Sequence, residues 1–255
     1  VKPVKKDYIA KEMAGGLGKR VRLGNNLLGK LLIRQLNASF SAPPIVLAQL
    51  SAVCRQSGAH QIKAYHTSRA VDIDAQTDIA VVLSSMVDYH NEVDFIHQLK
   101  ALNPGVFVVV VGSFASALPE IYQPVADIVI KGHPEAAMQK ILREGAGGEK
   151  IILSPDIEDL NTLPQIDWIP FIENKCYARR PFSKEKGISI QKSRGCTMSC
   201  NYCPYASFYG KARSFDTGRV LAAMEYYYHQ HHIRYFMFRD PNFGENRRES
   251  RDFLE

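Results

Sequence analysis

The sequence has no apolar run that approaches the roughly 20 residues needed for a membrane-spanning helix. It also has no leader built from a charged, an apolar and a small-residue segment, as secreted proteins carry. The chain has only 5 cysteines, and an odd set clustered mostly in one place is a poor framework for disulfide bonds. We therefore expect a cytoplasmic protein in a reducing compartment, with no membrane span.

Charge of one sign does not gather in any long stretch of the chain. The net charge is +6, but the basic residues are scattered and form only short clusters. A solvated surface is the favoured interpretation, although anionic substrates or cofactors would also suit this charge. A nucleic-acid partner is therefore not expected. Hydrophobic residues make up 45% of the chain, which is enough to bury a sizeable core.

Strand and helix patterns alternate in the first half of the chain. The strand candidates are continuous apolar runs, which are typical of parallel strands covered on both faces. We therefore predict a flavodoxin-like (Rossmann-type) parallel sheet, within an α/β domain that covers residues 1–145. Its predicted strands are 61–65, 78–83, 106–111 and 127–131, and its predicted helices are 43–58, 88–101, 115–122 and 135–143.

Two segments show weaker patterns. Residues 1–42 are rich in glycine and basic residues, and they indicate loops with one short helix near 27–33. Because such sheets usually have five strands and only four are clear, we expect the first strand to precede residue 1. Residues 146–187 contain several prolines, and we interpret them as an ordered linker without helix or sheet.

The last segment, 188–255, repeats the alternation. A strand at 187–192 leads into a loop with three cysteines. Asp216 is a predicted N-cap for a helix over 217–231, a strand follows at 233–238, and another helix begins near Arg247. This order predicts the opening of a parallel barrel or an open α/β sheet. The chain ends inside a helical pattern, so we expect a fragment of something longer.

Cys196, Cys200 and Cys203 have the spacing C-x3-C-x2-C. Thiolates this close can hold three corners of a [4Fe–4S] cluster, and the fourth iron is then open to a ligand. S-adenosylmethionine (SAM) could bind that iron through its amino and carboxylate groups. A zinc site with a fourth ligand such as Cys176, or a redox C-x2-C pair, is an alternative. We therefore predict that Cys196, Cys200 and Cys203 bind a metal centre.

Residues 193–206 (SRGCTMSCNYCPYA) resemble the signature of the radical SAM superfamily. The resemblance implies a [4Fe–4S] cluster and SAM as cofactors, and a partial (β/α)6 barrel whose first strand precedes the cysteines. It places Tyr202 beside the adenine of SAM. It also places Asp240, in the loop 239–244, near the SAM amino group. The alternative is that Asp240 caps the next helix.

The whole layout resembles radical SAM enzymes with a cobalamin-binding domain. The matching segments are 43–58, 108–120, 127–135 and 160–168. The resemblance implies that residues after two strands line the nucleotide tail of cobalamin, namely Ser84, Ser85, Gly112 and Ser113. Two features depart from the pattern. The chain has no D-x-H-x-x-G motif to supply a lower histidine ligand, and His133 stands where relatives have an acidic or small residue.

The resemblance implies an enzyme that forms a 5′-deoxyadenosyl radical for methyl transfer or a related radical reaction. A small-molecule or natural-product substrate and an electron donor such as flavodoxin or ferredoxin are the expected partners. The sequence specifies neither the substrate nor the catalytic residues. Alternatives are a radical SAM enzyme with a vestigial N-terminal domain, and a non-catalytic corrinoid or iron–sulfur carrier. We expect the 255-residue chain alone to be inactive.

Overall fold

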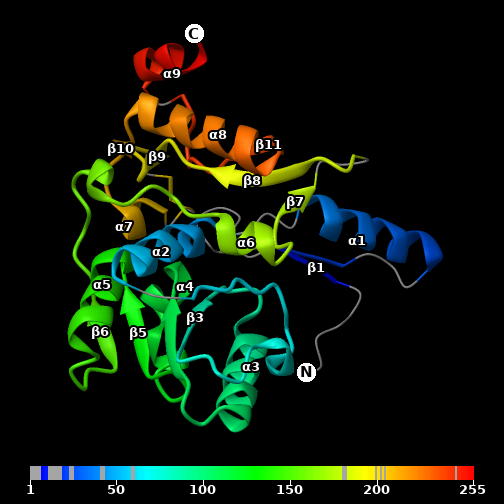
Figure 1. Cartoon of the computed structure of the whole chain (residues 1–255), viewed down its shortest axis with the longest axis vertical. Coiled ribbons are helices and arrows are strands. Elements are labelled where there is room, and N and C mark those ends of the chain that lie inside the picture. The colour runs from blue at the N-terminus through cyan, green and yellow to red at the C-terminus, as the bar shows by residue number, and fades with distance from the viewer. Residues whose placement is uncertain are drawn as a thin grey trace.

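The structure is a computed structural model. It describes residues 7–10, 19–22, 26–40, 44–58, 61–179, 183–198, 200–201, 203, 205–244 and 246–255. Figure 1 shows a parallel sheet with its helices in the lower part of the view, and a second α/β segment above it. The chain is thus an α/β protein with a flavodoxin-like sheet, as the sequence predicts.

The parallel sheet contains four strands in the order β3-β4-β5-β6. Their neighbouring pairs are all parallel. The apolar run at the centre of the sheet has side chains that alternate between two buried clusters, which is why it lacks polar positions. The bounds are Ile79–Leu83 for β3, Phe107–Val111 for β4, Ile128–Lys131 for β5 and Ile151–Leu153 for β6.

Helices cover both faces of this sheet. On one face, α3 and α4 pack with Val108 and Val110 of β4. On the other face, α2 and α5 pack with Val109 and Val111. These four helices confirm the predicted alternation, although the helix expected over 115–122 is a short α4 followed by a 3-10 turn, Pro119–Ile121. The bounds are Ile45–Gln56 for α2, Tyr89–Leu102 for α3, Ser113–Ala117 for α4 and Pro134–Glu144 for α5.

Two predictions for the N-terminal half are wrong. Residues 61–65 form no strand, although Ile62 and Ala64 alternate there with polar side chains. A parallel strand exists only through hydrogen bonds to a neighbour, and within the described residues β3 is bonded on one side alone, to β4. Conversely, part of the expected N-terminal loop forms an antiparallel pair of strands, β1 (Asp7–Ala10) and β2 (Lys19–Arg22). The short helix expected nearby is α1, Leu27–Phe40.

The expectation that residues 146–187 lack helix and sheet is also wrong. The strand β6 lies in this segment and extends the parallel sheet beyond β5. Its run of three apolar residues is too short to be recognised from periodicity. The same segment contains a 3-10 turn at Leu160–Thr162, the helix α6 at Ile169–Glu173 and the strand β7 at Ala178–Arg179.

The C-terminal segment has the predicted order of strand, loop, helix, strand, loop and helix. Strands β8 and β11 are parallel neighbours, and β7 pairs with β8 in the antiparallel sense. The predicted N-cap is confirmed, because Asp216 accepts a hydrogen bond from the backbone N–H of Arg219. The bounds are Lys186–Ile190 for β8, Thr217–His231 for α8, Ile233–Phe238 for β11 and Arg247–Leu254 for α9.

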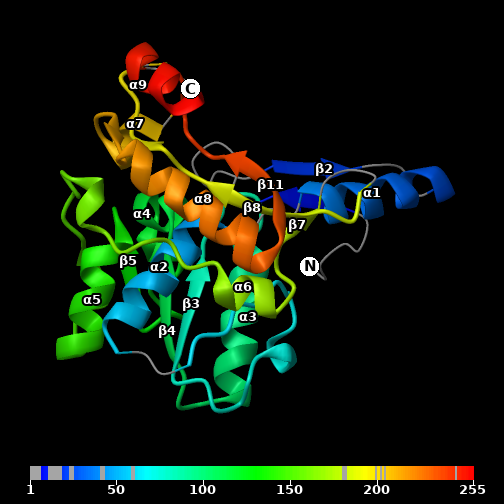
Figure 2. The same cartoon turned by 45° about the horizontal axis from the view of Figure 1, so that its top comes forward.

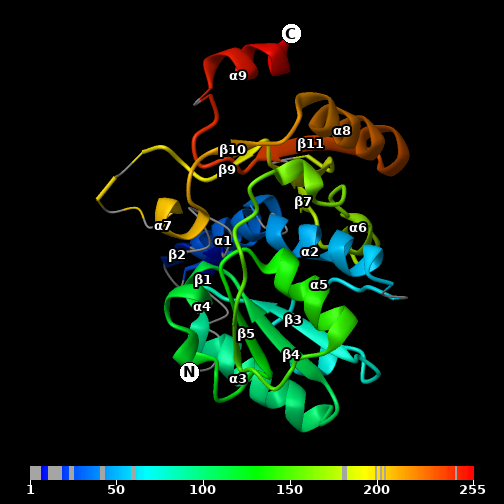
Figure 3. The ribbon, with the colours of Figure 1, turned by 90° about the vertical axis from the view of Figure 1, so that its left-hand side faces the viewer.

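The two parts of the chain pack together across α2 and α6. Figures 2 and 3 show α2 and α6 lying between the parallel sheet and the β8–α8–β11 unit. Trp168 is fully buried at the centre of this contact and meets Ile45 of α2 and Ile188 of β8 in one apolar cluster. The sheet therefore faces the C-terminal segment through a continuous core.

Candidate functional site

A short hairpin closes the base of the cysteine loop. Strand β9 (Ser193–Arg194) pairs antiparallel with β10 (Arg213–Ser214). Just outside this pair, the N–H of Phe215 donates to the carbonyl of Lys192 over 2.8 Å. Helix α7 (Tyr205–Tyr209) returns the chain toward β10. The three cysteines thus lie in a loop that begins at the carboxyl end of β8, as the sequence predicts for a strand followed by a site loop.

Gly195 explains how the loop starts. Its φ is +80°, and a Cβ built there would stand 2.0 Å from the carbonyl oxygen of Lys211. The next residue, Cys196, donates its N–H to the carbonyl of Gly210 over 3.2 Å. Glycine is therefore required because the outgoing and returning backbones touch. Sequence reasoning quoted this glycine within the motif but assigned it no role.

The three loop thiols are free. Cys203 is exposed, and Cys196 and Cys200 are partly exposed. A turn brings the N–H of Cys203 to the carbonyl of Cys200 at 3.0 Å. Among the described residues, no three His, Cys, Asp or Glu side chains are grouped closely enough to hold a metal ion.

As a donor set, three reachable thiols on one loop fit the corners of an iron–sulfur cluster. Their side chains would have to turn toward one another to bind it. The predicted adenine contact, Tyr202, lies outside the described residues. The metal-ligand assignment therefore stays a prediction.

Asp240 follows β11 and lies against the exit of β8. Its carboxylate accepts from the N–H of Lys192 at 3.0 Å, from the Oγ of Ser193 at 2.7 Å and from the N–H of Ser193. Burial raises the pKa of this carboxyl above its usual range, although these hydrogen bonds oppose the shift. The helix after it is capped by Asn246 instead, so Asp240 does not cap that helix. Its contact with SAM stays a prediction.

A buried ion pair joins the cysteine loop to the parallel sheet, and sequence reasoning missed it. Arg194 Nη1 donates to Glu135 Oε1 over 2.6 Å, and the side chains are only 4% and 2% exposed. Glu135 lies in the first turn of α5, directly after β5. Burial lowers the pKa of the Arg194 guanidinium, but the attraction of Glu135 and their hydrogen bond outweigh it and raise the pKa. Arg194 lies in the segment 193–206 and Glu135 in the segment 127–135, but no periodicity in the sequence indicates that they pair.

His133 lies beside the same ion pair. Its Nδ1 is 3.3 Å from Arg194 Nη1, and its Nε2 is 3.4 Å from Arg213 Nη2. Burial lowers the pKa of this histidine, and the charge of Arg194 lowers it further. The imidazole is therefore neutral near pH 7. The sequence shows this histidine where the resemblance implies an acidic or small residue, but it does not show the arginine neighbours.

The predicted cobalamin-contacting residues do come together at the carboxyl ends of β3 and β4. All four are buried. Ser84 Oγ accepts from the N–H of Ala115 over 2.9 Å, so it holds the start of α4. A Cβ on Gly112, whose φ is +116°, would lie 2.8 Å from that same Oγ. Ser113, the first residue of α4, completes this packed corner.

Ser85 belongs to a second buried group. Its Oγ donates to Glu92 Oε1 over 2.7 Å, and its N–H donates to Oε2 over 3.1 Å. The Tyr122 hydroxyl donates to the same Oε2 over 2.5 Å. The hydroxyls of Ser84 and Ser85 thus make internal contacts in this structure. Their contact with cobalamin stays a prediction.

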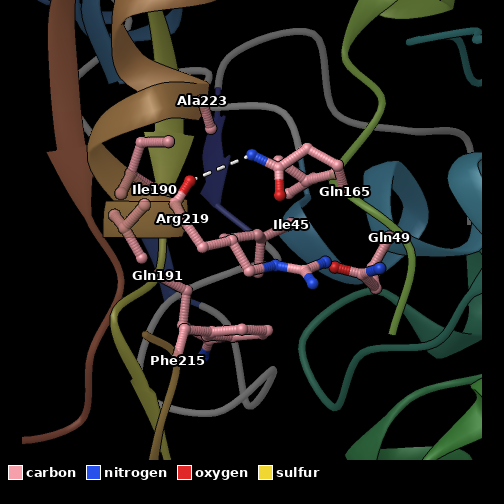
Figure 4. A pocket seen from close by; sticks show the side chains of 10 residues that line it. Ile45, Gln49, Gln165, Ile190, Gln191, Phe215, Arg219 and Ala223 are labelled. Atoms are coloured by element: carbon pink, nitrogen blue, oxygen red, sulfur yellow. Dashed lines mark hydrogen bonds between the residues drawn. The ribbon is translucent and has the colours of Figure 1, made fainter. Parts of the chain in front are cut away.

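A small cavity lies apart from the cysteine loop. Its volume is about 30 Å³, enough for little more than a water molecule. Figure 4 shows three of the side chains around it: Gln49 from α2, Arg219 from α8, and Gln165 from the segment before α6. Gln165 Nε2 donates to the Arg219 carbonyl over 3.1 Å. A wider hollow of about 520 Å³ continues from it past Tyr226. None of the lining residues comes from 195–203.

Comparison with known proteins finds distant relatives. No family model matches the chain. The chain is 26% identical over 211 residues to an uncharacterized methyltransferase of Synechocystis sp., a match that covers 81% of the chain and 37% of that protein. It is 25% identical over 150 residues to the anaerobic magnesium-protoporphyrin IX monomethyl ester cyclase of the same organism, covering 52% of the chain and 29% of the cyclase. Both relatives are named as enzymes, and the matches span well under half of their lengths.

One solved structure is also similar, at 17% identity and a TM-score of 0.36. It is the N-terminal domain of a hypothetical protein of Thermotoga maritima, and the match covers 45% of this chain and 91% of that one. Among the helices in the described part of the chain, none is long and apolar enough to cross a membrane.

Proposed function

We propose that this chain is the cofactor-binding part of a radical SAM enzyme. The observation that carries the proposal is the loop of Cys196, Cys200 and Cys203, three free thiols that follow the parallel strand β8. The neighbouring parallel strand, β11, ends at Asp240, whose carboxylate is bonded to the first residues of the same loop. The proposal is supported by this arrangement, in which the loop with three thiols and an acidic side chain follow two adjacent parallel strands.

In this proposal, Cys196, Cys200 and Cys203 would hold a [4Fe–4S] cluster and leave one iron open to SAM. When bound, the cluster supplies the electron that cleaves SAM into methionine and a 5′-deoxyadenosyl radical. A reduced flavodoxin or ferredoxin would be the electron donor for this chemistry, and 5′-deoxyadenosine would be its product. Asp240 would receive the SAM amino group, and Tyr202 would lie beside the adenine.

Methyl transfer to a small-molecule or natural-product substrate is the activity that we propose for the whole protein. It is supported by the relative that is named as a methyltransferase. We further propose that residues 1–145 bind cobalamin, because Ser84, Ser85, Gly112 and Ser113 gather at the carboxyl end of the sheet. The segment 146–187, which contributes β6 to the sheet, would link this domain to a barrel that opens at 188–255.

Anaerobic reconstitution with iron and sulfide tests the cluster. The wild-type chain should bind iron and sulfide, and adding SAM should change the electron paramagnetic resonance (EPR) spectrum of the reduced cluster. Cys196→Ser, Cys200→Ser and Cys203→Ser should each lose that SAM-dependent change. Cys176→Ser is the matched control, because Cys176 is a free, partly exposed thiol outside the loop. Equal iron binding by wild type and Cys196→Ser would overturn the proposal, as would zinc as the preferred metal.

Cobalamin binding has its own test. The purified chain, incubated with hydroxocobalamin and passed through a desalting column, should keep the cobalamin absorption spectrum. Gly112→Val should lose it, and a surface change such as Lys63→Ala should not. If the wild type retains no cobalamin while SAM still alters the EPR spectrum, the N-terminal domain is vestigial. Cobalamin binding without a SAM response would instead indicate a carrier.

A further inference from the structure

We propose that Arg194 is a positioning residue that holds the cysteine loop against the parallel sheet through Glu135 and His133. This inference rests on the proposed function, since it concerns the thiols that would bind the cluster. Arg194 stands two positions before Cys196. Glu135 and His133 both belong to the turn that follows β5. Residues 59 and 61 positions apart in sequence are therefore direct neighbours at the site.

The guanidinium has three polar partners. Its Nη1 donates to Glu135 Oε1 over 2.6 Å and lies 3.3 Å from His133 Nδ1. Its Nε donates to Gln191 Oε1, in the segment between β8 and β9, over 3.1 Å. A planar guanidinium with partners on separate nitrogens cannot turn without breaking a contact. The backbone of Arg194 is thus fixed relative to β5 as well as β8.

The second strand of the hairpin is tied to the same place. Arg213 of β10 has its Nη2 3.4 Å from His133 Nε2, and the same nitrogen donates to the carbonyl of Tyr209 over 2.6 Å. The ring of His133 also meets the Tyr209 ring edge-on at 5.4 Å. His133 therefore lies between arginines from both strands of the β9–β10 hairpin. This arrangement anchors both ends of the cysteine loop on one residue of the sheet domain.

The contact between the cysteine loop and the sheet depends on Arg194, because Arg194 neutralises the buried carboxylate of Glu135. Glu135 Oε2 is buried and, among the described residues, has no hydrogen-bond partner. The carboxylate is therefore neutralised through Oε1 alone, by a guanidinium that is itself buried. A buried charge that loses its only counterpart is strongly unfavourable. Loss of either Arg194 or Glu135 should favour opening of the cysteine loop, because opening lets water hydrate the charge that remains.

Hydrogen exchange of the metal-free chain tests this anchor without any cluster. Glu135→Gln keeps the shape of the side chain but removes its charge. We expect the backbone amides of 193–198 to exchange at least about tenfold faster in this variant, while those of β4 stay unchanged. Arg194→Met should have the same effect, and Arg194→Lys, which retains the charge without the planar geometry, should be intermediate. Unchanged exchange at 193–198 in Glu135→Gln would overturn the proposal.

Asp167→Asn is the matched control. Asp167 forms a different ion pair between distant parts of the chain, with its Oδ2 2.8 Å from Arg55 Nη2, and its carboxylate also accepts from the Ser51 hydroxyl and the Ile169 N–H. This variant should leave exchange at 193–198 as in the wild type. An equal acceleration in Asp167→Asn would show a general loss of stability and would overturn a specific role for Arg194.

The reconstituted protein provides a second readout. At equal iron content, Glu135→Gln should show a smaller SAM-dependent change in the EPR spectrum than wild type, because the thiols are less well placed. A full SAM response in Glu135→Gln would contradict the positioning role. If the wild type itself bound no iron, the proposed function would fail, whereas the exchange experiment would still decide whether Arg194 anchors the loop.

Discussion

At the scale of single residues, buried carboxylates determine how polar groups are arranged in the sheet domain. Glu92 is buried under β3 and accepts three hydrogen bonds, two from Ser85 and one from Tyr122. A buried charge is tolerated only when its oxygens are bonded in this way. The group therefore fixes the β3–α3 connection, and it does so directly behind the predicted cofactor loops.

Substitutions in this group should differ in cost. Glu92→Ala leaves three buried donors unpaired, so we expect it to lower the free energy of unfolding by more than about 3 kcal/mol. Tyr122→Phe removes one hydrogen bond to a charged group and should cost about 1.5–3 kcal/mol. Urea unfolding followed by circular dichroism measures both. Equal costs for the two variants would contradict the described network.

The same tyrosine predicts a pH dependence. Burial raises the pKa of Tyr122 above its usual range, and the nearby Glu92 raises it further. A raised pKa means that the folded state holds the proton more tightly than the unfolded state. The stabilisation is complete below about pH 10 and declines as the pH rises above that value. Stability measured from pH 8 to 11 should fall less steeply in Tyr122→Phe than in wild type.

Thiol reactivity should separate the cysteines of the metal-free protein. Burial raises the pKa of Cys54 to about 11, so roughly a thousandth of it is thiolate at pH 8. Cys203 is exposed and should be alkylated first by iodoacetamide, and Cys54 last. Below pH 11, each rise of one pH unit should speed the Cys54 reaction by roughly tenfold. Peptide mass spectrometry gives the rates, and comparable rates for both thiols at pH 8 would refute the assignment.

Sequence reasoning found some site residues and missed others for a physical reason. Spacing within one loop is visible in the chain, and it located Cys196, Cys200 and Cys203. The pairing of Arg194 with Glu135 depends on how β5 and β9 meet, which no local pattern records. Likewise, no local pattern shows that the missing Cβ of Gly112 leaves room for the Ser84 hydroxyl.

At the scale of elements, the β9–β10 hairpin is the part on which the candidate site depends. It has only two residues in each strand, so close backbone contact must replace a long ladder of hydrogen bonds. Gly195 makes that contact possible. Because the carbonyl of Lys211 occupies the space of a side chain, the hairpin tolerates no Cβ at this position.

Gly195→Ala should therefore displace the cysteine loop. We expect a loss of at least about 2 kcal/mol in the free energy of unfolding, from the left-handed backbone and the contact with Lys211. Gly148→Ala is the control, because its φ is also positive, at +81°, but no atom lies within 4 Å of its added Cβ. Thermal unfolding compares the two. A loss no larger than that of the control would show that the close contact has no cost.

Elements were predictable where their pattern was long or strongly apolar. The strand β4 and the helix α8 are examples, since the first is a run of buried valines and the second has an N-cap at Asp216. Short edge elements were not predictable. Residues 61–65 have a strand pattern without a bonded neighbour, whereas β6 has three residues and gains its partner only from the fold.

At the scale of the whole molecule, Trp168 reports on the contact between the two parts. It is the one tryptophan of the chain, and it is fully buried between α2, β8 and α8. The backbone N–H of Trp168 donates to the Tyr227 hydroxyl over 2.9 Å. That hydroxyl in turn donates to the carbonyl of Ile166 over 2.8 Å. Helix α8 is thus bonded to the segment that enters α6.

If this core makes the two parts one cooperative unit, fluorescence and circular dichroism should report the same unfolding midpoint. Trp168 fluorescence follows the contact alone, whereas circular dichroism follows all helices and strands. Tyr227→Phe removes the hydroxyl shared by Trp168 and Ile166. It should lower the free energy of unfolding by about 1–3 kcal/mol and shift both midpoints together. Tyr228→Phe is the matched control, because Tyr228 is exposed on the same helix. A fluorescence transition that precedes the loss of secondary structure would instead show that the parallel sheet unfolds separately from the segment that carries the cysteines.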